Sequence, residues 1–316
     1  MTDLPQSLIA SGPNDLSGFG RRTFVMGHNF APLPMFSDDG IAGLLDRHPR
    51  EDLYVMTMGS DPARPDWRHG DPGALSGAEL LEAVRRGRLW LNVKRVGIHH
   101  ADYRDLIARL YGELEEKVPG FHPIWTAGTM LVSSPGAMVF YHLDAPSNML
   151  WHIRGEKRVW VYPGEDERFV PAESLSRIMA GEADEGLDYD PSFDASAAVI
   201  DLHPGEVATW PQNAPHRIVN GDSLNISLST EHLTPRMRRR INVFRANRLL
   251  NGSFGLPARS VATEGAAARA KEILYYGVRT AQKLAGKRQV GYVEPMSFRV
   301  DLTAPDCIAA FSGRDG

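Results

Sequence analysis

Apolar residues recur at the spacing of an amphipathic helix in several places within the first 120 residues. Ser37 precedes one such pattern, and Ser76 with Glu79 forms a capping box before a second. The clearest pattern runs from residue 102 to residue 116. The sequence therefore predicts three helices in an N-terminal region, residues 1–120, that forms a helical and strand extension packed on the remaining chain.

Between residues 124 and 230 the pattern changes to short apolar runs that are rich in Val, Ile, Trp and Tyr and separated by Pro and Gly. The runs are TMLVSS, AMVFYH, RVWVYP, AAVIDL, EVATWP and LNISLST. Short strands at this spacing are typical of a β-sandwich or barrel. An acidic stretch, residues 164–195, interrupts them and is either solvated surface or a loop that covers a site. We expect a mainly β core over residues 121–233.

After Thr234, which precedes Pro235 at a first helical position, the pattern is helical again to about residue 250. A last helix is predicted over residues 264–283. Together they make residues 234–316 a C-terminal helical region. An arginine cluster near its start could contact an acidic substrate or lie in solvent or between subunits: Arg236, Arg238, Arg239 and Arg240.

Composition narrows the class of protein only slightly. A formal net charge of −4 and a charged content of 23% lack the basic excess of a nucleic-acid binder. The single cysteine, Cys307, excludes an internal disulfide and suits a reducing compartment. The first residues lack the pattern of a signal peptide, and no run of apolar residues is long enough to cross a membrane. We therefore expect a cytoplasmic protein with no membrane partner and no nucleic-acid partner.

Three residues have the types and the spacing of a metal site. His142 and Asp144 lie at the end of a predicted strand, where alternate side chains share a face, and a barrel would bring His216 beside them. Two imidazoles and one carboxylate leave coordination positions open, as iron(II) oxygenases require. Two other histidines, His152 and His203, lie near these residues in the sequence and could compete as ligands.

Lys157 follows His142 by 15 residues and begins another predicted strand. A lysine that points into a narrow barrel is costly unless an anion compensates its charge. A dicarboxylate that chelates a metal through one end could place its other carboxylate beside this ammonium. The pattern thus favours a metal together with a dicarboxylate co-substrate.

Two blocks that contain these residues, HLDAPSNMLWHIRGEKRVWVYP and DLHPGEVATWPQNAPHRIVN, resemble the JmjC-like, cupin-fold 2-oxoglutarate oxygenases. The resemblance covers roughly residues 124–232 and is strongest to the group of the asparaginyl hydroxylase that acts on hypoxia-inducible factor. It implies a double-stranded β-helix (jelly roll), iron(II) at the catalytic residues His142, Asp144 and His216, and 2-oxoglutarate held by Lys157.

The resemblance also implies contacts that line the co-substrate pocket. Asn148 looks like a polar pocket residue, and Ser229 like a residue that hydrogen-bonds the co-substrate. Strand alternation sets Asn225 and Ser227 on the same face as Ser229. Val139 stands where the family's hydroxylase has a threonine that touches 2-oxoglutarate, so one hydrogen bond must come from elsewhere or be absent.

The sequence thus predicts a 2-oxoglutarate-dependent dioxygenase that uses dioxygen to hydroxylate a protein side chain or a small molecule, or to demethylate it through a hydroxymethyl group. The presence of Asp144 argues against halogenation, because halogenating relatives lack that carboxylate. Two alternatives are a cupin metalloenzyme that does not use 2-oxoglutarate and a non-catalytic cupin-like sensor or binding module. Trp151, Trp160 and Trp210 are expected in the barrel core. We also expect a homodimer, because homodimers are common in the group that the sequence resembles.

Overall fold

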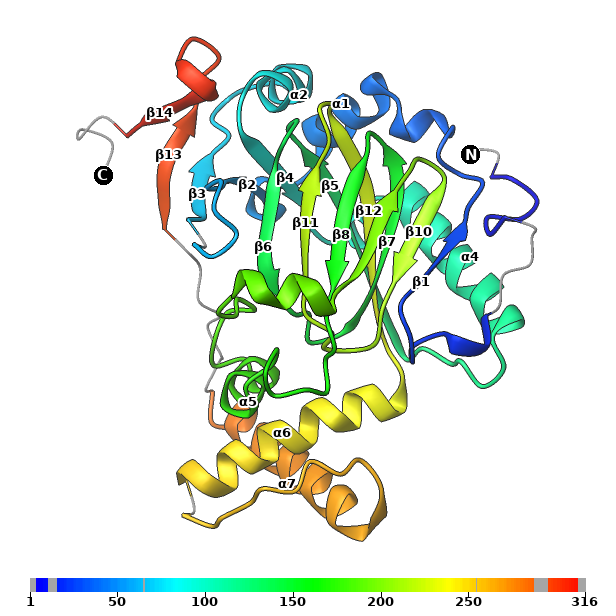
Figure 1. Cartoon of the computed structure of the whole chain (residues 1–316), viewed down its shortest axis with the longest axis vertical. Helices are drawn as coiled ribbons and strands as arrows, with labels where there is room; N and C mark the ends of the chain where they lie inside the picture. Colours follow the sequence, from blue (N-terminus) through cyan, green and yellow to red (C-terminus); the bar gives the residue numbers. More distant parts are fainter. Residues whose placement is uncertain (1–3, 11–15, 65, 254, 287–294, 312–316) are drawn as a thin grey trace.

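The structure is a computed structural model that describes residues 4–10, 16–64, 66–253, 255–286 and 295–311. It is mainly β, with two sheets and helices packed around them (Figure 1). The larger sheet has the strand order β1-β10-β7-β12-β5-β4-β2-β3-β13-β14. Its strands span Phe24–Gly27 (β1), Leu53–Thr57 (β2), Arg68–Asp71 (β3), Leu89–Val93 (β4), Trp125–Ser133 (β5), Ser147–Arg154 (β7), Glu206–Thr209 (β10), Asn225–Leu233 (β12), Met296–Val300 (β13) and Ile308–Ala310 (β14).

The smaller sheet has the order β6-β11-β8-β9, and all its neighbours are antiparallel. Its strands span Met138–His142 (β6), Lys157–Val161 (β8), Ala198–Leu202 (β9) and His216–Asn220 (β11). Successive strands from β5 to β12 alternate between the two sheets, apart from β8 and β9, which pair with each other. The six predicted apolar runs match β5, β6, β8, β9, β10 and β12, whereas β7, β11 and the N-terminal strands were not predicted individually.

The main apolar core lies on the outer face of the larger sheet, beneath the N-terminal helices. These helices are α1 (Asp38–Arg47), α2 (Gly77–Arg86), α3 (Val96–His99) and α4 (Ala101–Lys117). Ser37 caps α1, and the predicted capping box of Ser76 and Glu79 is present at α2. Alternation along β12 sends Ile226 and Leu228 into this core, so the other face of β12 is left for the space between the sheets.

Three further helices gather at one end of the sheets, where the strand β6 ends (Figure 1). They are α5 (Ala172–Ala180) within the acidic excursion, α6 (Pro235–Ser253) and α7 (Gly265–Leu284). Short 3₁₀ segments span Leu16–Gly18, Pro34–Phe36, Arg50–Asp52, Pro191–Ser196 and Pro305–Cys307. We expected a helical C-terminal region, but it is only partly helical, because β13 and β14 extend the larger sheet beside β3.

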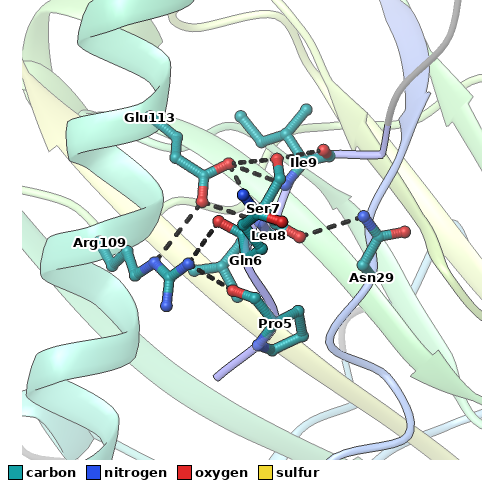
Figure 2. Close-up of polar contacts among 8 residues, drawn as sticks. All are labelled: Pro5, Gln6, Ser7, Leu8, Ile9, Asn29, Arg109 and Glu113. Atoms are coloured by element: carbon teal, nitrogen blue, oxygen red, sulfur yellow. Dashed lines mark hydrogen bonds and ion pairs between the residues drawn. The ribbon is translucent and has the colours of Figure 1, made fainter. Parts of the chain in front are cut away.

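The N-terminal segment is fastened to α4 by two side chains of that helix (Figure 2). The Glu113 carboxylate accepts hydrogen bonds from the backbone amides of Leu8, at 2.8 Å, and Ile9, at 3.1 Å, and from the Ser7 hydroxyl, at 2.9 Å. Arg109 donates to the carbonyls of residues 5 and 6. Burial alone would raise the pKa of Glu113, but these hydrogen bonds hold it below its usual value.

We predict that Glu113→Ala lowers the free energy of unfolding by about 2–4 kcal/mol, because several buried donors lose a charged acceptor. The depressed pKa means that this contribution is present above the unfolded-state pKa of about 4.3 and is lost as pH falls below it. Urea unfolding at pH 7 and pH 4 measures both effects. Glu116→Ala, an exposed position on the same helix, is the control; equal effects of the two substitutions would contradict the prediction.

Candidate metal and co-substrate site

A cavity of about 580 Å³ lies between the two sheets. Its walls come from the facing strands of both sheets, from the N-terminal strands β2, β3 and β4, and from the acidic excursion. The predicted metal residues His142, Asp144 and His216 line it, as do Lys157, Asn148 and Ser229. The cavity therefore collects most of the residues that the sequence indicated, from strands that are far apart in the chain.

Strand pairing brings the two histidines together. His142 ends β6 and His216 begins β11, and their Cα atoms are direct partners in the register of these strands. His142 Nε2 lies 4.0 Å from Asp144 Oδ1, and His216 Nε2 lies 3.6 Å from Asp144 Oδ2. The ligand atoms of the three residues all lie within 4.8 Å of one another, and they form the one such group in the described part of the chain.

Hydrogen bonds orient both imidazoles for a metal. His142 Nδ1 lies 2.9 Å from the carbonyl oxygen of Phe140, and His216 Nδ1 lies 3.2 Å from that of Ala214. A carbonyl oxygen only accepts, so each Nδ1 carries the hydrogen and each Nε2 presents a lone pair toward Asp144. This is the tautomer that a metal ligand requires.

The charges of the site also fit a divalent cation. Burial raises the pKa of the Asp144 carboxyl, and the nearby His142 and Asn148 side chains offset only part of that effect. Burial and the neighbouring His142 lower the pKa of His216 well below its ordinary value, so this imidazole is neutral and able to coordinate. Asp144 Oδ2 is buried without a hydrogen-bond partner. A bound cation would compensate that oxygen.

Lys157 lies in the same cavity and is only 6% exposed. Its Nζ donates to Asn220 Oδ1 at 2.8 Å and faces the Ser133 hydroxyl at 3.5 Å, and among the described residues no carboxylate pairs with it. Burial lowers the pKa of Lys157 to about 7. His216 and Asn220 are on the same face of β11, and four residues of strand span about 13 Å. Lys157, the register partner of Asn220, is thus a buried amine that has no carboxylate partner in the described part of the chain and lies at the other end of β11 from His216.

Ser229 and Asn148 connect two adjacent strands of the larger sheet, β12 and β7. The Ser229 hydroxyl donates to Asn148 Oδ1 at 3.2 Å. Ser227 and Asn225 share the inward face of β12 but are not among the residues that line the cavity: the Ser227 hydroxyl pairs with His152 Nδ1 at 3.0 Å, and the Asn225 amide donates to the Ser223 carbonyl. The geometry does not support co-substrate contacts for these two residues. A register shift between Ile226 and Ser227 accompanies this arrangement.

The competing histidines lie outside the metal group. His152 uses both ring nitrogens, one toward Ser227 and the other toward the Gly155 carbonyl at 2.9 Å. His203 is exposed and lies 3.9 Å from a carboxylate oxygen of Glu156. Neither residue lines the cavity.

The tryptophans and the arginine cluster have distinct positions. Trp151 is fully buried and donates to the Thr230 hydroxyl, whereas Trp210 lines the cavity with its ring centroid 4.4 Å from that of His216. Arg239 forms an ion pair with Glu272 of α7. Part of the arginine cluster therefore joins α6 to α7.

Several cavity residues were missed by sequence reasoning. Glu231 lies two residues after Ser229 on β12, so the same alternation could have found it. Lys94, Tyr54 and Trp67 come from N-terminal strands and loops that carried no recognisable motif. Glu185, which was also missed, belongs to the acidic excursion.

The excursion is more than solvated surface, because its inner edge runs beside the metal strand. The Leu143 amide donates to the Glu185 carbonyl at 3.0 Å, and the Leu187 amide donates to the Tyr141 carbonyl at 3.1 Å. Glu185 lines the cavity, where the surrounding protein atoms and the nearby Asp144 raise its pKa to about 8. Burial and Asp144 likewise raise the pKa of Glu231 to about 7.

A solved structure shares this fold, and two further structures are less similar. An X-ray structure of Escherichia coli YcfD superposes with a TM-score of 0.53 at 19% identity, over 88% of this chain and 70% of that chain. A crystal structure of the E. coli ribosomal oxygenase YcfD gives a TM-score of 0.48 at 17% identity, over 87% and 68%. A complex of YcfD with cobalt and 2-oxoglutarate gives 0.45 at 19% identity, over 84% and 65%. At these identities the likeness is one of fold.

No family model matches the chain, and no curated protein matches it. Of the helices in the described residues, none has both the length and the apolar character needed to cross a bilayer.

We predict that Co²⁺, used as a redox-stable substitute for iron(II), raises the melting temperature of the protein. At a hundredfold excess over Kd the stabilisation is about 2.7 kcal/mol. Asp144→Ala should abolish the shift without lowering the stability of the metal-free protein, because it removes a buried carboxylate oxygen that has no partner. Differential scanning calorimetry with and without Co²⁺ measures both. His203→Ala is the control, and a shift that survives in Asp144→Ala would count against the site.

Proposed function

We propose that this protein is an iron(II)- and 2-oxoglutarate-dependent oxygenase. His142, Asp144 and His216 would hold the iron, and Lys157 would bind the carboxylate of 2-oxoglutarate that is distal to the metal. The observation that carries the proposal is the presence, in one cavity, of a metal triad and a buried ammonium without a carboxylate partner among the described residues. A dicarboxylate bridging the two would compensate both charges.

The alternation of strands between the two sheets supports the double-stranded β-helix expected from the resemblance. In that arrangement β5-β12-β7-β10 of the larger sheet faces β6-β11-β8-β9. His142 and His216 lie at one end of these strand pairs, and Lys157 lies at the other. A co-substrate bound along this axis would leave the end with the two histidines for the prime substrate.

When bound, iron(II) would supply the oxidative decarboxylation of 2-oxoglutarate by dioxygen and the oxidation of a substrate C–H bond. The chain's own residues fix the geometry for it. Asn220 holds the Lys157 ammonium, Ser229 and Asn148 present polar groups from the opposite wall, and Trp210 packs on His216. The Thr129 hydroxyl lines the same cavity as Val139 and is a candidate for the hydrogen bond that Val139 cannot make.

The prime substrate is proposed to be a protein side chain, since a neighbour of the same fold is a ribosomal oxygenase. Hydroxylation is the reaction that follows most directly from the triad, and demethylation would be its variant on an N-methyl group. Homodimer formation and a cytoplasmic location remain predictions.

Anaerobic titration of the apoprotein with iron(II) and then 2-oxoglutarate tests the proposal. A weak visible charge-transfer band that requires both components is expected, because the keto acid end chelates the metal. His142→Ala should abolish the band, and Lys157→Met should require much higher 2-oxoglutarate concentrations for the same band. Lys117→Met, at an exposed position of α4, is the control. Bound metal without any band would favour a cupin metalloenzyme or a binding module that does not use 2-oxoglutarate.

Binding of 2-oxoglutarate should be accompanied by proton uptake above pH 7. The lowered pKa of about 7 leaves Lys157 largely neutral at higher pH, and an adjacent carboxylate would restore its charge. The apparent affinity should therefore be nearly constant below pH 7 and fall by up to about tenfold per pH unit above it. Calorimetry at pH 8.5 in buffers of different ionisation enthalpy measures the uptake. Lys157→Met should show none, and pH-independent affinity in the wild-type protein would contradict the assignment.

A further inference from the structure

The cavity has a second group of charges that iron and 2-oxoglutarate would not use. Apart from Asp144 and Lys157, its charged lining residues are Asp184, Glu185, Glu231 and Lys94. Glu185 comes from the acidic excursion and Glu231 from β12. The two glutamates thus approach the cavity from segments that are unrelated in the sequence.

Backbone geometry fixes both glutamates close to the metal residues. The carbonyl of Glu185 accepts from the amide of Leu143, the residue that precedes Asp144. Glu231 pairs in register with Asn148, the residue whose side chain interacts with Asp144. Both carboxyl groups therefore lie at the end of the cavity where the triad is, rather than at the Lys157 end.

With its carboxyl groups ionised, this end of the cavity would carry an excess of negative charge. In the proposed complex, the positive charges of iron(II) and Lys157 would balance the carboxylates of 2-oxoglutarate and Asp144. The remaining lining residues offer three carboxyl groups against the single ammonium of Lys94. Lys94 Nζ lies 4.1 Å from the centroid of the Tyr54 ring, and in the described part of the chain no ion pair joins it to either glutamate. A cation from outside the chain would stabilise the ionised form of carboxyl groups that lie around one cavity.

Aromatic rings line the same cavity. Tyr54 stacks on His69 with centroids 5.1 Å apart, and Trp67 packs on Phe140 at 4.3 Å; all four residues line the cavity. Flat aromatic walls suit the apolar stem of a long cationic side chain and can contact its charged head. A neutral or anionic ligand would gain little from this combination of groups.

We propose that Glu185 and Glu231 bind a guanidinium or ammonium group of the prime substrate and hold the adjacent carbon atoms near the metal. The acidic excursion is then a specificity element, since it supplies one of the two carboxylates. This inference rests on the proposed function for the reaction. The binding of a cationic group does not depend on it.

Calorimetric titration of the Co²⁺-loaded protein, with and without 2-oxoglutarate, tests the binding. The probes are N-acetyl-arginine methylamide and N-acetyl-lysine methylamide, with the citrulline and norleucine analogues as neutral counterparts of similar shape. Each cationic probe should bind at least about tenfold more tightly than its neutral counterpart, the equivalent of one partly buried ion pair. Free arginine and lysine form a second arm, because tighter binding of the free amino acids would indicate a small-molecule substrate and tighter binding of the blocked forms a protein side chain.

The variants Glu231→Gln and Glu185→Gln keep the side-chain shape and remove the charge. Each should weaken the cationic probes about tenfold and leave the weak binding of the neutral analogues unchanged. Glu167→Gln, at an exposed position of the excursion that does not line the cavity, is the matched control.

The outcomes separate the two proposals. Charge-selective binding that is lost in both glutamine variants supports the inference, even if 2-oxoglutarate fails to bind and the oxygenase proposal falls. Equal affinity for charged and neutral probes, no measurable binding of the cationic probes, or unchanged binding in both variants would overturn it, whether or not the charge-transfer band forms.

Discussion

The register between β6 and β11 is the constraint on which the site depends. Because His142 and His216 are direct partners across these strands, their imidazoles are held side by side, with ring centroids 4.2 Å apart. A slip of one residue would turn one ring to the opposite face of the sheet. The smaller sheet fixes this register through β8, which pairs with β11 along its whole length and places Lys157 opposite Asn220. One set of strand pairings thus positions both the metal residues and the ammonium.

Such a site lowers the stability of the folded protein, and it lies apart from the apolar core that stabilises the fold. Asp144 and Lys157 are buried ionisable groups, and neither has a close partner of opposite charge among the described residues. Burying such groups opposes folding. The compensating apolar core lies on the other face of the larger sheet, against α1, α2 and α4. Along β12, Ile226 and Leu228 therefore join this core, whereas Ser229 and Glu231 on the other face line the cavity. The hollow, polar interior can exist because the burial of apolar surface takes place elsewhere.

The same separation explains what could be predicted from the sequence. Helices α1, α2 and α4 were predictable because each has one apolar face, and α1 and α2 also have a capping serine at the start. Strand β7 was harder, since its inward positions carry Asn148 and His152 where a simple barrel would have apolar residues. The triad and Lys157 could be found because short motifs on single strands carry them. Glu185 could not, because its place in the cavity depends on how the excursion folds back on β6, and backbone hydrogen bonds, which leave no trace in the choice of side chains, determine that.

The excursion is also anchored from outside the cavity, which bears on how far it can move. Arg217 follows His216 in β11 and points to the opposite face, where it pairs with Asp194 of the excursion and lies 3.5 Å from the centroid of the Trp160 ring. Tyr162 donates to the same carboxylate at 2.6 Å. The segment that carries Glu185 is therefore held at Asp194 on the outer face and at residues 185–187 beside the metal strand. Since both anchors connect to the strands that hold His142 and His216, a displacement of the excursion large enough to remove Glu185 from the cavity must break contacts of the metal strands themselves. Substrate recognition and metal geometry are in this way coupled through the smaller sheet.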